Sequence, residues 1–251
     1  MLPLLLALLQ PPATAVPFDT PAADDLDAIR KKAEKRPDPP KLDPKNTHKP
    51  LSADGELLLE LTADKKPVRV LVATEVCLVR GSLEVFLTRK NTKEHEAILR
   101  TSLDARLIHG ALVAAGGKVG RPAQFVNAAG DAAFQPATGG AVAVDVHYRL
   151  AGKLHSHPAQ EWVRDKDTGK PLPHGWVFAG SRFLANEDKP DEPPFYTANS
   201  GEVVGIANFG DAMLDVPAEV SKDNAALNYE AWTEKIPPLL SGVWLTLAPK
   251  K

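Results

Sequence analysis

Short apolar runs separated by polar turns dominate the chain from residue 51 onward. Residues 142–148 alternate strictly, with valine or tyrosine at every even position. This is the period of a strand that turns one face to the core and the other to solvent. Runs rich in leucine and valine at 56–61 and 67–73, separated by the polar turn 64–66, predict two more strands.

Further runs continue the strand series toward the C-terminus. The runs at 76–79 and 83–88 flank Arg80-Gly81-Ser82, a short glycine-bearing loop that predicts a hairpin. Turns with proline or glycine separate the later runs, which are 160–164, 175–183 and 203–208.

One segment has a helical pattern instead. Residues 103–115 are apolar around most of a helical circumference and end at Gly116-Gly117, which predicts a buried core helix. The sequence therefore predicts an α+β fold, with a predominantly antiparallel β-sheet and one buried helix at about 103–115. Residues 51–251 are expected to form a single domain without internal repeats.

The N-terminal residues differ in character from this domain. Residues 1–9 are almost entirely apolar, and Ala13-Thr14-Ala15 is a small-x-small pattern. Together they predict a signal peptide over 1–15, cleaved near Ala15, and a secreted or periplasmic protein. No Lys or Arg precedes the apolar run, so the alternatives are that translation starts upstream or that the segment is not a signal.

Residues 16–50 carry seven prolines and dense charge of both signs. They predict a largely disordered linker, with a short helix that ends at Pro37. The alternative is a docking peptide for a partner.

Composition narrows the classes of function. The net charge is −2, and aromatic residues make up only 6% of the chain and do not interleave with basic ones, so a nucleic-acid partner is not expected. Cys77 is the only cysteine, which excludes an internal disulfide and an iron–sulfur cluster held by four cysteines of this chain. No stretch after the leader is long and apolar enough to predict a transmembrane segment.

The most informative polar segment is residues 92–96, Thr-Lys-Glu-His-Glu, which precedes the predicted helix and its His109. Flanking carboxylates favour the charged imidazolium of His95 and suit it to proton transfer. If the segment folds back on the helix, His95, Glu96 and His109 could bind a divalent metal. Lys93 could then hold an anionic substrate group.

The structural alternative is that Thr92 and Glu96 cap a helix beginning near Lys93. The candidate site residues under the enzymatic interpretation are Lys93, Glu94, His95, Glu96 and His109. The metal candidates among them are His95, Glu96 and His109.

Other motifs carry less information. His155 and His157 would share one face of a strand, but Pro158 follows directly and favours a loop. The chain has no Gly-x-Ser-x-Gly elbow, phosphate-binding glycine loop or dinucleotide fingerprint.

The order of these segments resembles the YdjY-like domain family, which is found in exported bacterial proteins. The resemblance covers roughly residues 51–249. It is carried by residues 76–84, 92–96 and 108–112, Gly116, Gly120, residues 176–181 and 208–212, Asn224 and residues 236–238.

The resemblance implies no molecular activity. Some family members are described as ferredoxin-like because they carry extra cysteines, and the lone Cys77 departs from that pattern. A redox function is therefore not carried over. The residues that match the family's polar positions are Thr92, Lys93, Glu94, His95, Glu96 and His109.

Two classes of function remain open from the sequence. The first is a non-catalytic module of the periplasm or cell envelope that binds a small ligand or an envelope or extracellular protein, using strand edges and long loops such as 186–194. The second is a metal-dependent or acid–base enzyme that uses His95, Glu96 and His109. A structural part of a cell-surface assembly is a third possibility.

Overall fold

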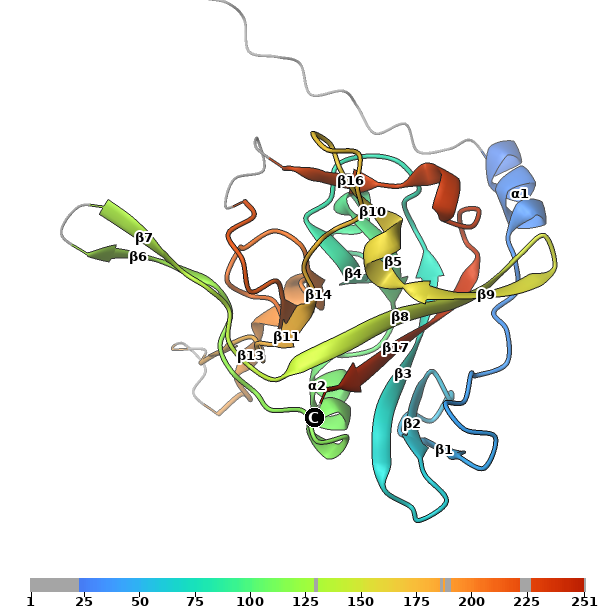
Figure 1. Cartoon of the computed structure of the whole chain (residues 1–251), viewed down its shortest axis with the longest axis horizontal. Coiled ribbons are helices and arrows are strands. Elements are labelled where there is room, and N and C mark those ends of the chain that lie inside the picture. Colours follow the sequence, from blue (N-terminus) through green and yellow to red (C-terminus); the bar gives the residue numbers. More distant parts are fainter. Residues whose placement is uncertain (1–22, 129–130, 186, 188–190, 222–226, 251) are drawn as a thin grey trace, which may run out of the picture.

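Eight strands close into a barrel in the computed structural model of the chain (Figure 1). The structure describes residues 23–128, 131–185, 187, 191–221 and 227–250. Around the barrel the strands are β3 (Pro67–Val76), β17 (Gly242–Pro249), β8 (Ala141–Leu150), β11 (Trp176–Phe178), β15 (Leu214–Asp215), β14 (Val204–Gly205), β4 (Val85–Arg89) and β5 (Ala97–Thr101), and β5 pairs back onto β3.

Most neighbours in the barrel are antiparallel, and the parallel pairs are β4–β5 and β14–β15. The prediction of a predominantly antiparallel sheet is confirmed, but its closure into a barrel was not predicted. Three elements extend the sheet: β1 (Thr47–Pro50) and β2 (Leu57–Leu61) beyond β3, and β9 (Lys153–Pro158) beside β8.

Three two-stranded pairs stand outside this sheet. They are β6 (Gln124–Ala128) with β7 (Asp131–Gln135), β10 (Val163–Asp165) with β16 (Tyr229–Ala231), and β12 (Phe183–Leu184) with β13 (Phe195–Tyr196). The β6–β7 hairpin extends away from the barrel (Figure 1). The described 3₁₀ turns are η1 (Glu94–Glu96), η2 (Ala159–Trp162), η3 (Thr197–Ser200) and η5 (Thr233–Lys235).

Alternation along the strands fills the barrel. On β8, the even positions 142–148 are buried in the main core and the odd positions are only partly buried, as the sequence predicts. On β3 and β17 both faces are covered, because Leu71, Ala73 and Trp244 form a second apolar cluster with Leu58 of β2. These residues alternate with strand neighbours that belong to the main core, so the second cluster lies on the outer face of the barrel.

The predicted core helix is α2 (Ala105–Ala114), which packs against β3 and β17. Asp104 caps its first turn by accepting a hydrogen bond from the N–H of Arg106 at 2.8 Å. At the other end Gly116 has a φ of +92°, and the N–H of Gly117 donates to the carbonyl of Leu112 at 2.8 Å. The two glycines therefore end the helix as the sequence predicts.

Part of the predicted linker is packed on the barrel. After α1 (Ala23–Lys32), the carbonyl of Pro37 accepts a hydrogen bond from the Trp244 indole at 2.9 Å. Further along, Glu60 accepts one from the N–H of Leu42 at 2.7 Å. Residues 33–46 thus contact Trp244 of the second apolar cluster and Glu60 of β2 before they lead into β1. The structure therefore places these residues on the barrel, where the sequence predicts a largely disordered linker. The predicted signal peptide and residues 16–22 lie outside the described residues.

The predicted hairpin around Gly81 is also wrong. β3 ends at Val76, and the segment after it pairs with distant residues. Ser82 bridges to Glu230, and the N–H of Ala231 donates to the carbonyl of Gly81 at 2.9 Å. Strand β4 then pairs with β5 and β14 and not with the end of β3.

Candidate functional site

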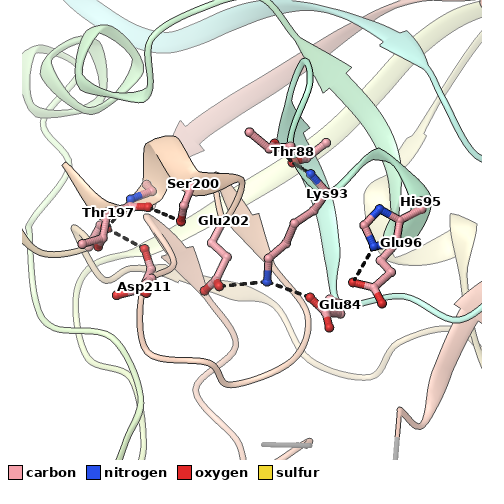
Figure 2. Close-up of polar contacts among 12 residues, drawn as sticks. Glu84, Thr88, Lys93, His95, Glu96, Thr197, Ser200, Glu202 and Asp211 are labelled. Carbon is pink, nitrogen blue, oxygen red and sulfur yellow. Dashed lines mark hydrogen bonds and ion pairs between the residues drawn. The ribbon is translucent and has the colours of Figure 1, made fainter. Parts of the chain in front are cut away.

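Lys93 lies at the centre of a buried acidic cluster (Figure 2). Its Nζ atom is 2.7 Å from Oε2 of Glu84 and 3.1 Å from Oε1 of Glu202. The Glu84 and Glu202 side chains are 1% and 5% exposed, and that of Lys93 is 26% exposed. The ammonium is also 4.9 Å from the centre of the Phe209 ring. Two buried carboxylates and an aromatic face therefore surround the ammonium of Lys93.

A compact turn after β4 directs Lys93 into this cluster. The Thr92 hydroxyl donates to the carbonyl of Arg89 at 2.6 Å and lies 2.8 Å from the hydroxyl of Thr88. A Cβ atom on Gly201, whose φ is +128°, would lie only 2.8 Å from Oγ1 of Thr88 and 2.9 Å from Oγ1 of Thr92. Glycine at this position therefore lets the connection that carries Glu202 approach the turn.

Glu96 adds a third acid beside Glu84. Burial raises the pKa of the Glu96 carboxyl, and the neighbouring Glu84 carboxylate raises it further. Burial likewise raises the pKa of Glu202, although Lys93 opposes this shift. Burial alone would lower the pKa of Lys93, but Glu202 and Glu84 outweigh it and raise that pKa.

Two carboxylate oxygens of the cluster are unpaired. Oε1 of Glu84 and Oε2 of Glu202 are buried without a hydrogen-bond partner among the described residues. One ammonium faces more than one carboxylate, so the cluster favours keeping a proton on an acid. A protonated Glu96 can donate that proton to Glu84, since Figure 2 shows the two carboxyl groups side by side.

Glu94 and His95, the other residues of the polar segment, lie outside this cluster. Glu94 accepts hydrogen bonds from the N–H of Asn91 and from Arg100, each at 2.9 Å. His95 is half-exposed, with its Nε2 atom 3.6 Å from Oε2 of Glu96. The helix expected to begin near Lys93 is only the three-residue turn η1, and it has no side-chain cap. The capping role predicted for Thr92 and Glu96 is therefore wrong.

His109 lies elsewhere, on α2. Its Nδ1 atom is 2.8 Å from the hydroxyl of Tyr196, and its ring packs edge-on against Phe178. Tyr196 donates to the carbonyl of Gly180 at 2.9 Å, so the imidazole N–H is the donor to the Tyr196 oxygen. Burial lowers the pKa of His109, which favours the neutral ring.

The structure does not assemble the predicted metal site. Within the part of the chain that is described, no group of three or more His, Cys, Asp or Glu side chains is arranged to hold a metal ion. His95, Glu96 and His109 therefore do not form such a group. His155 and His157 do lie on a strand, β9, contrary to the expected loop, and the His155 ring stacks on Tyr148 and on His157.

The partners of Lys93 were missed from the sequence. Glu202 is 109 positions from Lys93, so no local spacing connects them. A usable signal was present, however, because Glu84 and Glu202 are single acids beside apolar runs, Leu83-Glu84-Val85 and Glu202-Val203-Val204. An acid in that position is buried only when a cation or hydrogen bonds compensate for it.

The family model described as YdjY domain matches residues 61–248, a range that takes in the barrel from β3 to the penultimate residue of β17. No curated protein and no solved structure matches the chain. No helix among the described residues has the length and apolar character needed to cross a membrane.

Proposed function

The chain belongs to the YdjY domain family, and we propose that it is an exported, non-catalytic module that binds a partner protein through the β12–β13 hairpin. The acidic cluster does not favour the enzymatic alternative, because both carboxylates that face Lys93 neutralise its charge. An anionic substrate group would find no free cation there.

One observation carries the proposal. Phe183 and Phe195 are 58% and 52% exposed, and Leu184 between them in the hairpin is 49% exposed. In the pairing, Phe183 faces Tyr196 and Leu184 faces Phe195, so apolar side chains occupy both faces of a two-stranded element. Clustered exposed apolar residues of this kind are typical of protein–protein contact surfaces.

The surroundings of the hairpin indicate the chemistry of the partner. Glu187 and Asp191 are exposed in the connection between β12 and β13, and the nearby Arg182 is paired with Asp211. We expect a partner that offers an apolar pocket with a basic rim, because charge complementarity speeds and orients association.

Site-specific photocrosslinking in cells that produce the full chain tests the proposal. A photoreactive p-benzoylphenylalanine in place of Phe195 should give a discrete adduct. The same probe in place of Leu154, which is 65% exposed on β9, should not. Adducts of equal intensity from both positions, or none from Phe195, would contradict the proposal.

Export rests on the sequence of residues 1–15 and is tested separately. Mass spectrometry of the mature protein should place its N-terminus directly after Ala15. A chain that keeps residues 1–15 and stays in the cytoplasm would refute export without affecting the crosslinking result.

A further inference from the structure

A groove on the outer face of the barrel has features of a small-ligand site. It measures about 430 Å³ and lies between the outer side of β8, β11 and the start of η2, within the volume range typical of ligand pockets. Its walls include Ala143, Pro158, Val177 and Pro217. An alkyl chain could therefore lie against these walls and lose contact with water.

Two polar groups in the groove lack partners. Asp145 is only partly exposed and lines the groove, and among the described residues its carboxylate has no hydrogen bond or ion pair. Oε1 of Gln160 is buried and has no hydrogen-bond partner in the same described part. Buried polar atoms in folded proteins are normally paired, so the Gln160 oxygen points to a missing donor. The partly exposed Asp145 carboxylate adds negative charge to the same groove.

The charges define the kind of donor. Burial raises the pKa of Asp145, and Arg69 and Lys250 oppose that shift, so no cation fully compensates for the carboxylate. A ligand N–H bound to a carboxylate forms a charge-assisted hydrogen bond, which is stronger than a neutral one. The Gln160 amide can accept a second N–H.

We propose that this groove binds a primary ammonium group on a short alkyl chain, with the ammonium between Asp145 and Gln160 and the chain along the apolar wall. The source of that group is either a free alkylamine or a lysine side chain of another protein. Lys250 lines the groove, and its backbone N–H donates to the carbonyl of Ala141 at 2.8 Å. Its positive charge opposes the ligand.

Titration of the full chain with n-butylammonium chloride, followed by NMR of the backbone amides, tests this site. Shifts should concentrate around residues 141–145, 158–160 and 175–177. Butanol has the same chain without the charge, and butyrate reverses the charge, so both should bind at least about tenfold more weakly. Nα-acetyl-lysine methylamide, compared with butylammonium, shows whether a lysine side chain or a free amine is preferred.

Two substitutions give opposite expected effects. Asp145→Asn should weaken butylammonium binding at least about tenfold, whereas Lys250→Met should strengthen it. Asp64→Asn, at an exposed turn, is the matched control and should change nothing. Melting curves establish that each variant is folded.

The proposal is overturned if butanol binds as well as butylammonium, if a folded Asp145→Asn variant keeps full affinity, or if no amide near the groove shifts. None of these results bears on the β12–β13 hairpin. Failure here and failure of the proposed partner surface are therefore distinguishable.

Discussion

Lys93 is the residue on which the acidic cluster depends. Replacing it with methionine would leave Glu84 and Glu202 buried without a cation, and we expect Lys93→Met to lower the free energy of unfolding by about 3 kcal/mol. Urea denaturation at pH 7 measures this directly.

The matched comparison is Glu202→Gln. The glutamine carbonyl can still accept from Lys93, and the substitution removes part of the excess negative charge. Its effect should stay within about 1 kcal/mol. Equal losses from the two substitutions would mean that packing, and not charge, sets the stability of the cluster.

His147 provides a test at acid pH. It occupies an odd position of the alternating run 142–148, whose pattern predicts solvent exposure there, but it is partly buried on β8, and its Nε2 atom lies 3.2 Å from Oγ1 of Thr246. Burial, reinforced by the positive charge of Arg69, lowers the pKa of His147 to about 4. Folding therefore favours the neutral ring. The stabilisation is complete above the unfolded pKa of about 6.5 and is lost as the pH falls through about 4.

The variant His147→Gln keeps a partner for Thr246 and cannot titrate. Between pH 7 and pH 4.5, the free energy of unfolding of the parent should fall by roughly 2 kcal/mol more than that of the variant. Unfolding curves at the two pH values give the difference. Parallel losses in both proteins would show that His147 does not contribute to acid sensitivity.

At the scale of elements, the segment before β1 contributes to stability through its contacts with a buried ion pair. Glu60 is fully buried and is paired with Arg69, and residues 33–46 complete that pair. The Nδ2 atom of Asn46 donates to Glu60 at 2.7 Å, and Nη2 of Arg69 donates to the carbonyl of Pro40 at 2.8 Å.

Deletion of residues 1–46 should therefore lower the free energy of unfolding by at least about 3 kcal/mol, because it exposes Trp244 and removes hydrogen bonds from a buried ion pair. Deletion of residues 1–22 is the control and should leave the urea midpoint of the barrel unchanged. If the longer deletion is equally harmless, residues 23–46 are a dispensable tether.

The elements also show what the sequence could predict. Strand β8 and helix α2 were predicted because burial follows their own periods of two and 3.6 residues. The segment around Gly81 was not, because its backbone bonds go to residues 229–231, which no local pattern reveals. The partners of Lys93 were missed for the same reason: the sequence indicated Lys93, but its buried partner Glu202 is 109 positions away along the chain.

At the scale of the whole molecule, closure of the barrel protects the amides of its strands from exchange, whereas the hairpins outside the barrel are less protected. β17 is hydrogen-bonded to β3 on one side and to β8 on the other. Its amides can exchange only when the barrel opens. By contrast, β6 and β7 pair only with each other among the described strands, and an isolated two-stranded hairpin is marginally stable in water.

Hydrogen exchange followed by mass spectrometry should show this difference. Peptides from β17 should exchange at the rate set by global unfolding, and peptides from β6–β7 should exchange much faster, through local opening. Protection of β6–β7 equal to that of β17 would contradict this and would mean that a second surface covers the hairpin. Dilution of the sample distinguishes the source of such protection, because protection by a second copy of the chain decreases with concentration, whereas protection within one chain does not.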